Sequence, residues 1–145
     1  MRILGLDMGD RKIGVALSDP MGVLASPLLV FEHKDDAEDI IVIQGLVEQY
    51  QVEKIIIGLP QSMDGTIGPQ AEKVKTFTEK LKKQLSVPVD LRDERLTTQA
   101  ARRMLQETSS KKLTKKKKIV DDAAAAAIIL QSYLNESHPL EYPPE

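Results

Sequence analysis

The first residues of the chain place a carboxylate at the end of a strand-like segment, and this feature limits the folds that the chain can adopt. An apolar run from Ile3 to Leu6 stops at Asp7, and Gly9 then marks a turn. A second run, Lys12–Leu17, alternates apolar residues with small or polar ones. Two such runs joined by a short Gly-containing segment predict an antiparallel hairpin. Because a lone carboxylate is costly to bury, Asp7 requires a hydrogen-bonding partner or a bound cation.

The rest of the chain alternates between strand-like and helix-like patterns. Pro27 lies inside one strand-like run, which predicts an edge position or a bulge for that strand. Strands are predicted at Ile3–Leu6, Lys12–Leu17, Val23–Phe31, Lys54–Gly58 and Val87–Arg92. Helices are predicted at Asp35–Gln51, at Pro69–Leu85, from Thr97 or Thr98 to about Glu107, and from about Val120 to Asn135, with loops at Leu59–Gly68 and Thr108–Lys118. This order predicts an α/β fold with a five-stranded mixed sheet, three antiparallel N-terminal strands plus two parallel strands, flanked by helices.

The composition is that of one soluble globular domain, with 145 residues of which 41% are hydrophobic and 29% charged. We expect residues 1–138 to form this domain and residues 139–145 to be a flexible tail. No apolar run is long enough to span a membrane, no signal peptide is recognisable, and the absence of cysteine excludes disulfides, so a cytoplasmic location is expected. Any metal must be bound by oxygen ligands or by His33 and His138, which favours Mg²⁺ or Mn²⁺.

Acidic residues from distant parts of the chain have positions that predict a common site. Asp7 ends the first strand and Glu94 follows the last one, and sites in such sheets form beyond the carboxyl ends of strands. In the final helix, Asp122 has the spacing of Ala126, Ile129 and Tyr133, the face expected to pack on the sheet. Carboxylates in contact cannot all stay ionised without a cation. Two divalent ions would neutralise them and would support attack of water on a phosphodiester.

Each of these features also has a simpler explanation. Asp7 could cap the turn, and Glu94 could form an ion pair with Arg92 or Arg95. Asp121 and Asp122 are expected at a helix start for capping reasons alone. The basic residues around Lys115–Lys118 could form a solvated loop, Phe77 and Tyr133 are expected in the core, and no role is assigned to His33 or His138.

Four segments resemble the signature segments of the YqgF family, also called RuvX. They are DMGDRKIGVALSD, IIIGLPQSMDGT, LRDERLTTQAA and VDDAAAAAIILQSYL, and the resemblance extends over nearly the whole chain. The family implies a ribonuclease-H-like fold. Its members are described as Holliday-junction resolvases, by their similarity to RuvC, and as nucleases that process the 5′ end of precursor 16S rRNA.

The resemblance also implies roles for individual residues. Asp7, Glu94 and Asp122 are the implied catalytic residues and ligands of a two-metal Mg²⁺ or Mn²⁺ site, with Asp121 as the alternative to Asp122. The residues expected to contact nucleic acid are Arg11, Lys12, Arg95, Arg102, Arg103, Lys115, Lys116, Lys117 and Lys118. Supporting positions are Gly9, Gly14, Asp64, Gly65, Thr97 and Asp121.

The function expected from these observations is that of a metal-dependent endonuclease acting on structured nucleic acid, with the 5′ end of precursor 16S rRNA as the first substrate. The alternatives are a Holliday-junction resolvase acting on four-way DNA and a non-catalytic nucleic-acid or ribosome-associated module. The hairpin also resembles the phosphate-binding turn of actin-like ATPases, which enclose a nucleotide between two such domains, whereas this chain has the length of one. The expected partners are rRNA precursors or branched DNA, and ribosomal particles; the chain is expected to be a monomer or a homodimer.

Overall fold

The computed structural model describes residues 1–60, 68–93 and 115–137, and of residues 115–122 and 137 it describes the helical backbone alone. In chain order the elements are β1 (Ile3–Met8), β2 (Lys12–Ser18), β3 (Ala25–Glu32), α1 (Asp36–Tyr50), β4 (Lys54–Leu59), α2 (Pro69–Gln84), β5 (Val89–Asp93) and α4 (Lys115–Ser137). The predicted helix that begins at Thr97 or Thr98 and the predicted tail at 139–145 lie outside the described residues. None of the helices in these ranges is long and apolar enough to cross a membrane.

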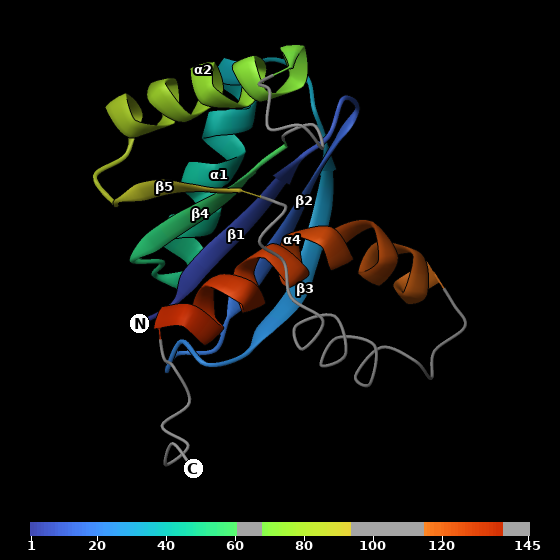
Figure 1. The fold of residues 1–145 in the computed structure, drawn as a ribbon, viewed down its shortest axis with the longest axis vertical. Coiled ribbons are helices and arrows are strands. Elements are labelled where there is room, and N and C mark those ends of the chain that lie inside the picture. Colours follow the sequence, from blue (N-terminus) through green and yellow to red (C-terminus); the bar gives the residue numbers. More distant parts are fainter. Residues whose placement is uncertain (61–67, 94–114, 138–145) are drawn as a thin grey trace.

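The strands form one five-stranded mixed sheet in the order β3-β2-β1-β4-β5 (Figure 1). The first three strands pair antiparallel, whereas β4 is parallel to both β1 and β5. The expected sheet is therefore confirmed. Pro27 lies in β3, which is an edge strand, and its register with β2 shifts between Val15 and Ala16, as Pro27 predicts.

Helices cover both faces of the sheet, as Figure 1 shows, with α4 crossing one face and α1 and α2 on the other. The first face of the sheet, toward α1 and α2, is built from large branched side chains. Among its fully buried residues are Leu6, Ile13, Ile57 and Leu81. The core on the second face is smaller. There the buried alanines of α4, with Leu130, pack on Ile56. Because successive side chains of a strand alternate, Ile56 and Ile57 supply opposite cores.

Gly5 lets α4 approach the sheet closely. A Cβ atom built at Gly5 would lie 2.8 Å from Leu130 Cβ and 3.1 Å from the carbonyl oxygen of Ala126. Any larger residue would therefore push the helix away from β1. The small side chains of Ala126 and Ala127, both fully buried, permit this approach.

Several predicted boundaries are wrong, among them the start of the third strand, which is Ala25 rather than Val23. Lys115–Lys118 was predicted to be a loop, but α4 begins at Lys115, so Asp121 and Asp122 lie about two turns inside the helix and cannot cap its start. Lysine is a good helix former, and no Gly or Pro interrupts the run. The last strand begins at Val89 rather than Val87, because Pro88 has no N–H to donate to a strand ladder, although its carbonyl accepts a 2.9 Å bond from Ile55 N.

Candidate functional site

Asp7 lies near the carboxyl end of β1, the central strand, with its side chain on the face covered by α4. Ile3 belongs to the core under α4 and Gly5 touches that helix, so alternation along the strand places Asp7 on the same face. Asp7 is half-buried and lies opposite Gly14 of β2, which has no side chain to fill the adjoining space. Within the described part of the chain, no hydrogen bond or ion pair neutralises its carboxylate.

The turn after Asp7 is closed by the backbone. Gly9 N donates a 2.9 Å hydrogen bond to the carbonyl oxygen of Lys12. A Cβ atom at Gly9 would lie 2.7 Å from that same oxygen, so only glycine fits. Arg11 and Lys12 are exposed at this turn. The hairpin therefore presents two basic residues next to the strand end where Asp7 lies.

The other proposed site residues are only partly described. The backbones of Asp121, Asp122 and Lys115–Lys118 belong to α4, but their side chains lie outside the described residues. Also outside are Asp64, Gly65, Glu94, Arg95, Thr97, Arg102 and Arg103. Among the residues that are described, no group of three or more acidic or histidine side chains could hold a metal ion. The meeting of Asp7 with Glu94 and Asp122 thus stays a prediction.

The C-terminal half of α4 is anchored to the sheet by polar contacts. Lys54 Nζ donates a 2.8 Å hydrogen bond to Tyr133 Oη and forms a 2.9 Å ion pair with Asp90. The bond with Tyr133 and the pair with Asp90 raise the pKa of Lys54. Arg92 of β5 forms an ion pair with Glu136. These contacts hold the C-terminal half of α4 against β4 and β5, from Lys54 at the start of β4 to Arg92 near the carboxyl end of β5.

Gln131 fixes α4 against the start of β3, the edge strand on the other side of the sheet. Its Oε1 accepts a 2.9 Å bond from Ala25 N, and its Nε2 donates a 2.9 Å bond to the carbonyl oxygen of Val23. That loop is itself held by Asp19, whose carboxylate accepts hydrogen bonds from Val23 N at 2.7 Å and Leu24 N at 2.9 Å. These backbone donors, that of Leu24 first, lower the pKa of Asp19.

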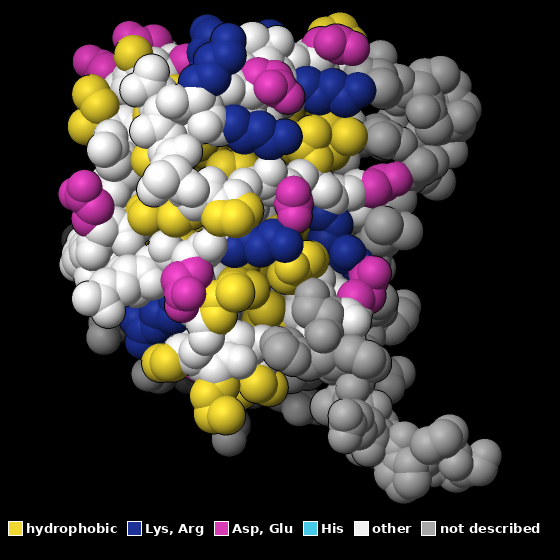
Figure 2. All heavy atoms as spheres, turned by 90° about the vertical axis from the view of Figure 1, so that its left-hand side faces the viewer, with side chains coloured by type: hydrophobic (Ala, Val, Ile, Leu, Met, Phe, Trp, Pro, Cys, Tyr) yellow, Lys and Arg dark blue, Asp and Glu magenta, His cyan; other side chains and the backbone are white. Residues whose placement is uncertain are grey.

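The surface along the β5 side of the molecule mixes both signs of charge, as Figure 2 shows for the left-hand side of Figure 1. Ion pairs account for part of this pattern: Lys80 with Asp36 at 2.8 Å and Lys54 with Asp90. A surface that attracts nucleic acid non-specifically carries an excess of positive charge. The described residues of this side therefore lack the electrostatic character of a phosphate-binding face.

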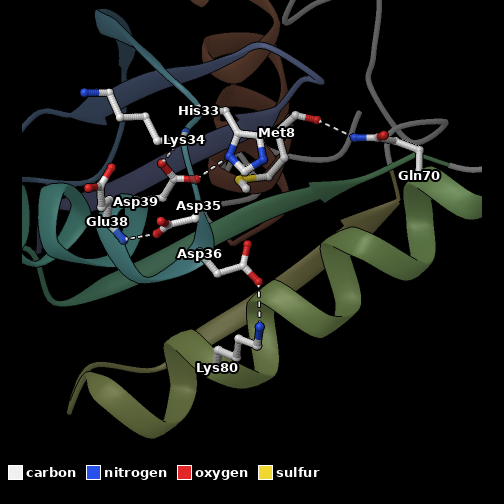
Figure 3. Close-up of polar contacts among 9 residues, drawn as sticks. All are labelled: Met8, His33, Lys34, Asp35, Asp36, Glu38, Asp39, Gln70 and Lys80. Carbon is white, nitrogen blue, oxygen red and sulfur yellow. Dashed lines mark hydrogen bonds and ion pairs between the residues drawn. The ribbon is translucent and has the colours of Figure 1, made fainter.

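His33, directly after β3, and Asp39 of α1 form a pair that was not predicted from the sequence. His33 Nδ1 is hydrogen-bonded to the carboxylate of Asp39, and the other oxygen of Asp39 accepts a 3.2 Å bond from Lys34 N (Figure 3). Asp39 is 1% exposed. Its position four residues before the buried Ile43 was the available signal, because a carboxylate on the buried face of a helix needs a partner.

Beside this pair is a cavity of about 310 Å³, between the β1–β2 turn, the start of α1 and one side of α2. Its lining includes Met8, His33, Asp36, Gln70 and Phe77. Gln70 Nε2 donates a 3.0 Å hydrogen bond to the carbonyl oxygen of Met8, which ties α2 to the strand end (Figure 3). The cavity and Asp7 thus occupy opposite faces of the sheet at the same end of β1.

Comparison with known proteins gives two consistent results. The family model described as "RuvX: Holliday junction resolvase" matches residues 1–136. The chain is 52% identical over 101 residues to the "Putative pre-16S rRNA nuclease" of Halothermothrix orenii, a match that covers 70% of this chain and 72% of that protein. A protein of the same name from Clostridium botulinum is 48% identical over 101 residues, covering 70% of this chain and 74% of its own.

Solved structures show the same fold. RuvC of Thermus thermophilus, in complex with a Holliday junction substrate, superposes with a TM-score of 0.65 at 14% identity, covering 94% of this chain and 96% of that chain. Another structure of Thermus thermophilus RuvC gives a TM-score of 0.59, covering 94% and 97% of the two chains. The expected RuvC-like, ribonuclease-H-like fold is therefore confirmed.

Proposed function

Because the chain belongs to the RuvX family and is therefore a nuclease, a hydrolase of phosphodiester bonds, we propose that it is a metal-dependent endonuclease that processes the 5′ end of precursor 16S rRNA. The observation that carries the proposal is Asp7, a half-buried carboxylate at a strand end with no cationic partner in the described ranges. A carboxylate in that position fits a hard divalent cation such as Mg²⁺ or Mn²⁺, which prefers oxygen ligands.

The position of α4 supports Asp122 as a second ligand. Tyr133 contacts Lys54, the neighbour of Ile3 in the sheet, so the C-terminal half of α4 lies at the start of β1. From the crossing at Gly5, Asp7 is two residues along the strand, roughly 6.6 Å at about 3.3 Å per residue. One helical turn from Ala126 toward the N-terminus of α4 is roughly 6 Å at about 1.5 Å per residue, and it leads to Asp122.

The burial of α4 supports Asp122 over Asp121. Ala126, four residues after Asp122, is fully buried, whereas Ala125, four residues after Asp121, is exposed. Residues four apart share a helical face. In the proposed site Asp122 therefore faces the sheet and Asp121 lies toward its edge or the solvent.

The pattern of β5 supports Glu94 as the third ligand. Asp90 and Arg92 both contact partners of the α4 side, Lys54 and Glu136. Alternation along the strand would place Glu94, two residues after Arg92, on that side and at the carboxyl end of the sheet. Three acids from β1, α4 and the end of β5 would then surround one point.

In the proposed mechanism the residues of the chain bind and orient the substrate. Asp7, Glu94 and Asp122 would hold two divalent ions, which supply activation of water and stabilisation of the leaving oxygen. Gly14, opposite Asp7, adds no side chain of its own that would stand between β2 and a phosphate. Arg11 and Lys12 at the exposed turn, with Lys115–Lys118 at the start of α4, would neutralise neighbouring phosphates, so binding would weaken steeply with salt.

Precursor rRNA is proposed as the substrate because it is named for relatives about half identical to this chain. The proposal implies activity in the cytoplasm on immature ribosomal particles, for which a single active site in a monomer would suffice. The family description favours a second candidate, the four-way DNA junction, which a symmetric homodimer with two active sites would resolve.

Parallel assays on both substrates test the proposal. The full chain is incubated with a precursor 16S rRNA fragment and with a four-way DNA junction, each with Mg²⁺, with Mn²⁺ or with a chelator. We expect metal-dependent cleavage near the mature 5′ end of the RNA and little cleavage of the junction. Faster cleavage of the junction would replace the RNA proposal by the second candidate. Binding of both without cleavage in any metal would indicate a non-catalytic module.

A further inference from the structure

The cavity beside His33 and Asp39 has the size and lining of a small-molecule site. Its volume of about 310 Å³ is at the lower end of the range of about 300–1,000 Å³ typical of such sites. Val74 and Phe77, each 1% exposed, form an apolar floor together with Met8. Such sites combine an apolar body with a few fixed polar groups. The polar groups here include His33, Asp36 and Gln70, each of which is held by a partner.

The polar groups mainly offer hydrogen-bond acceptors. His33 Nδ1 is committed to the buried carboxylate of Asp39, which leaves Nε2 as the other polar atom of the ring. Gln70 donates through Nε2 to Met8, which leaves its Oε1 as an acceptor. Asp36 Oδ2 is paired with Lys80, which leaves Oδ1. Figure 3 shows these side chains held by their partners on three different elements.

The charge of the lining argues against an anionic ligand. Asp10, Asp36 and Glu72 line the cavity against one lysine, Lys73. A phosphate would meet repulsion here, whereas a neutral group with N–H donors would not. A ligand that satisfies these conditions has a small apolar body with amino donors at its edge.

We propose that this cavity binds an unpaired nucleobase with an exocyclic amino group, namely cytosine, adenine or guanine, of the nucleic acid that the enzyme cleaves. Exocyclic amines of these bases donate hydrogen bonds at their edges, and proteins that recognise RNA bind bases which have left the stack. Met8 lines the cavity and follows Asp7 directly, with Cα atoms about 3.8 Å apart. A strand bound across this end of the sheet would therefore pass both the acids and the cavity.

This inference rests on the proposed function for the source of the base, but the cavity can be tested without cleavage. The chain contains two histidines, His33 and His138, so the imidazole signals in a nuclear magnetic resonance spectrum can be assigned with one variant, His138→Ala. The protein is titrated with cytidine, adenosine, uridine and ethylguanidinium. We expect the His33 signals to shift with cytidine and adenosine, and roughly fivefold weaker binding of uridine, which lacks the amino donor.

A pair of tryptophan variants, one that blocks the cavity and one that does not, provides the matched comparison. Thr76 lines the cavity and is exposed, so Thr76→Trp blocks it without a change in the core. Glu79, also exposed on α2, is not among the lining residues, and Glu79→Trp is the control. We expect Thr76→Trp to abolish the nucleoside shifts and to lower kcat/KM on the RNA, and Glu79→Trp to change neither. Equal thermal midpoints of the two variants show that both fold.

The outcomes separate this inference from the proposed function. RNA cleavage by the wild type without any nucleoside-induced shift at His33 overturns the nucleobase site and leaves the nuclease assignment intact. A shift with ethylguanidinium stronger than that with cytidine also overturns it, in favour of a cationic group from a protein partner. Nucleoside shifts that Thr76→Trp abolishes, without cleavage of any substrate, support the site and contradict the proposed function.

Discussion

The two faces of the sheet are packed by different means. On the face toward α1 and α2, large branched side chains such as Ile57 fill the space between two helices and the strands. On the other face a single helix, α4, lies close to the strands because alanines meet Gly5. Polar anchors at its C-terminal half, such as Gln131 with Ala25, then hold it in place. The first face is thus a conventional core, and the second is a closely fitted surface that ends at Asp7.

The face toward α1 and α2 therefore contributes mainly to stability, and the face under α4 leads to the candidate functional site. A core of large side chains buries a carboxylate only with a partner, as Asp39 has in His33, whereas a close helix can bring acids to a strand end with little apolar bulk between them. The variants below test the two faces in turn, starting with the largest expected effect.

Adjacent isoleucines of β4 compare the two cores directly. Ile56 and Ile57 are both 0% exposed and point to opposite faces. Truncation of a buried isoleucine to alanine costs about 2–5 kcal/mol, depending on how far the surroundings collapse. We expect Ile57→Ala to cost about 4 kcal/mol and Ile56→Ala about 3 kcal/mol, because one helix can settle more easily than two. Urea unfolding measures both; a larger loss for Ile56→Ala would contradict the comparison.

Glycine to alanine changes at two positions should have opposite signs. Gly5→Ala forces a methyl group against Leu130 and the backbone of Ala126, and overpacking of this kind costs about 2 kcal/mol. A methyl group added at Gly45, in the middle of α1, would have nothing within 4 Å. Gly45→Ala should therefore raise the free energy of unfolding by about 0.5–1 kcal/mol. If Gly5→Ala proved neutral, the close approach of α4 would not be a constraint.

The loop that receives Gln131 should contribute a pH-dependent stability. The folded chain holds the pKa of Asp19 below its ordinary value of 3.8, chiefly through the N–H of Leu24. The ionised carboxylate therefore stabilises the fold above about pH 4, and this contribution is lost as the pH falls through the folded pKa. We expect Asp19→Asn to cost about 1 kcal/mol at pH 7, since bonds to a charged acceptor are stronger. The difference from the wild type should shrink below about pH 4; a constant difference down to about pH 2 would contradict this account.

Much of the fold could be predicted from local patterns. Alternation predicted the hairpin, and the helix predicted at Asp35–Gln51 is confirmed as α1, with Asp35 as its N-cap, whose side chain accepts a 2.8 Å bond from Glu38 N. The start of α4 was not predicted, because a run of charged lysines is also typical of a solvated loop, although lysine is a good helix former. The contact of Gly5 with Leu130 joins residues far apart in the sequence, and no local pattern reports it.

The residues of the candidate site also differ in how far they could be predicted from the sequence. Asp7 was recognisable because a charge at the end of an apolar strand is a local anomaly. The pair of His33 and Asp39 was not, since it crosses from the end of β3 into α1 and its two residues share no periodic pattern. Whether Glu94 and Asp122 join Asp7 depends on long-range packing, which neither spacing nor composition determines.

The most direct test of the proposed metal site is the cleavage rate of Asp7→Asn beside that of Glu53→Gln, an exposed acid at the opposite end of the sheet. Both substitutions remove one negative charge and preserve shape. With Mg²⁺ or Mn²⁺ and precursor 16S rRNA, we expect Asp7→Asn to lose activity by at least about a hundredfold, as expected for a lost metal ligand, with an unchanged thermal midpoint. Glu53→Gln should cleave at the rate of the wild type. Metal-dependent cleavage by Asp7→Asn at the wild-type rate would contradict the account.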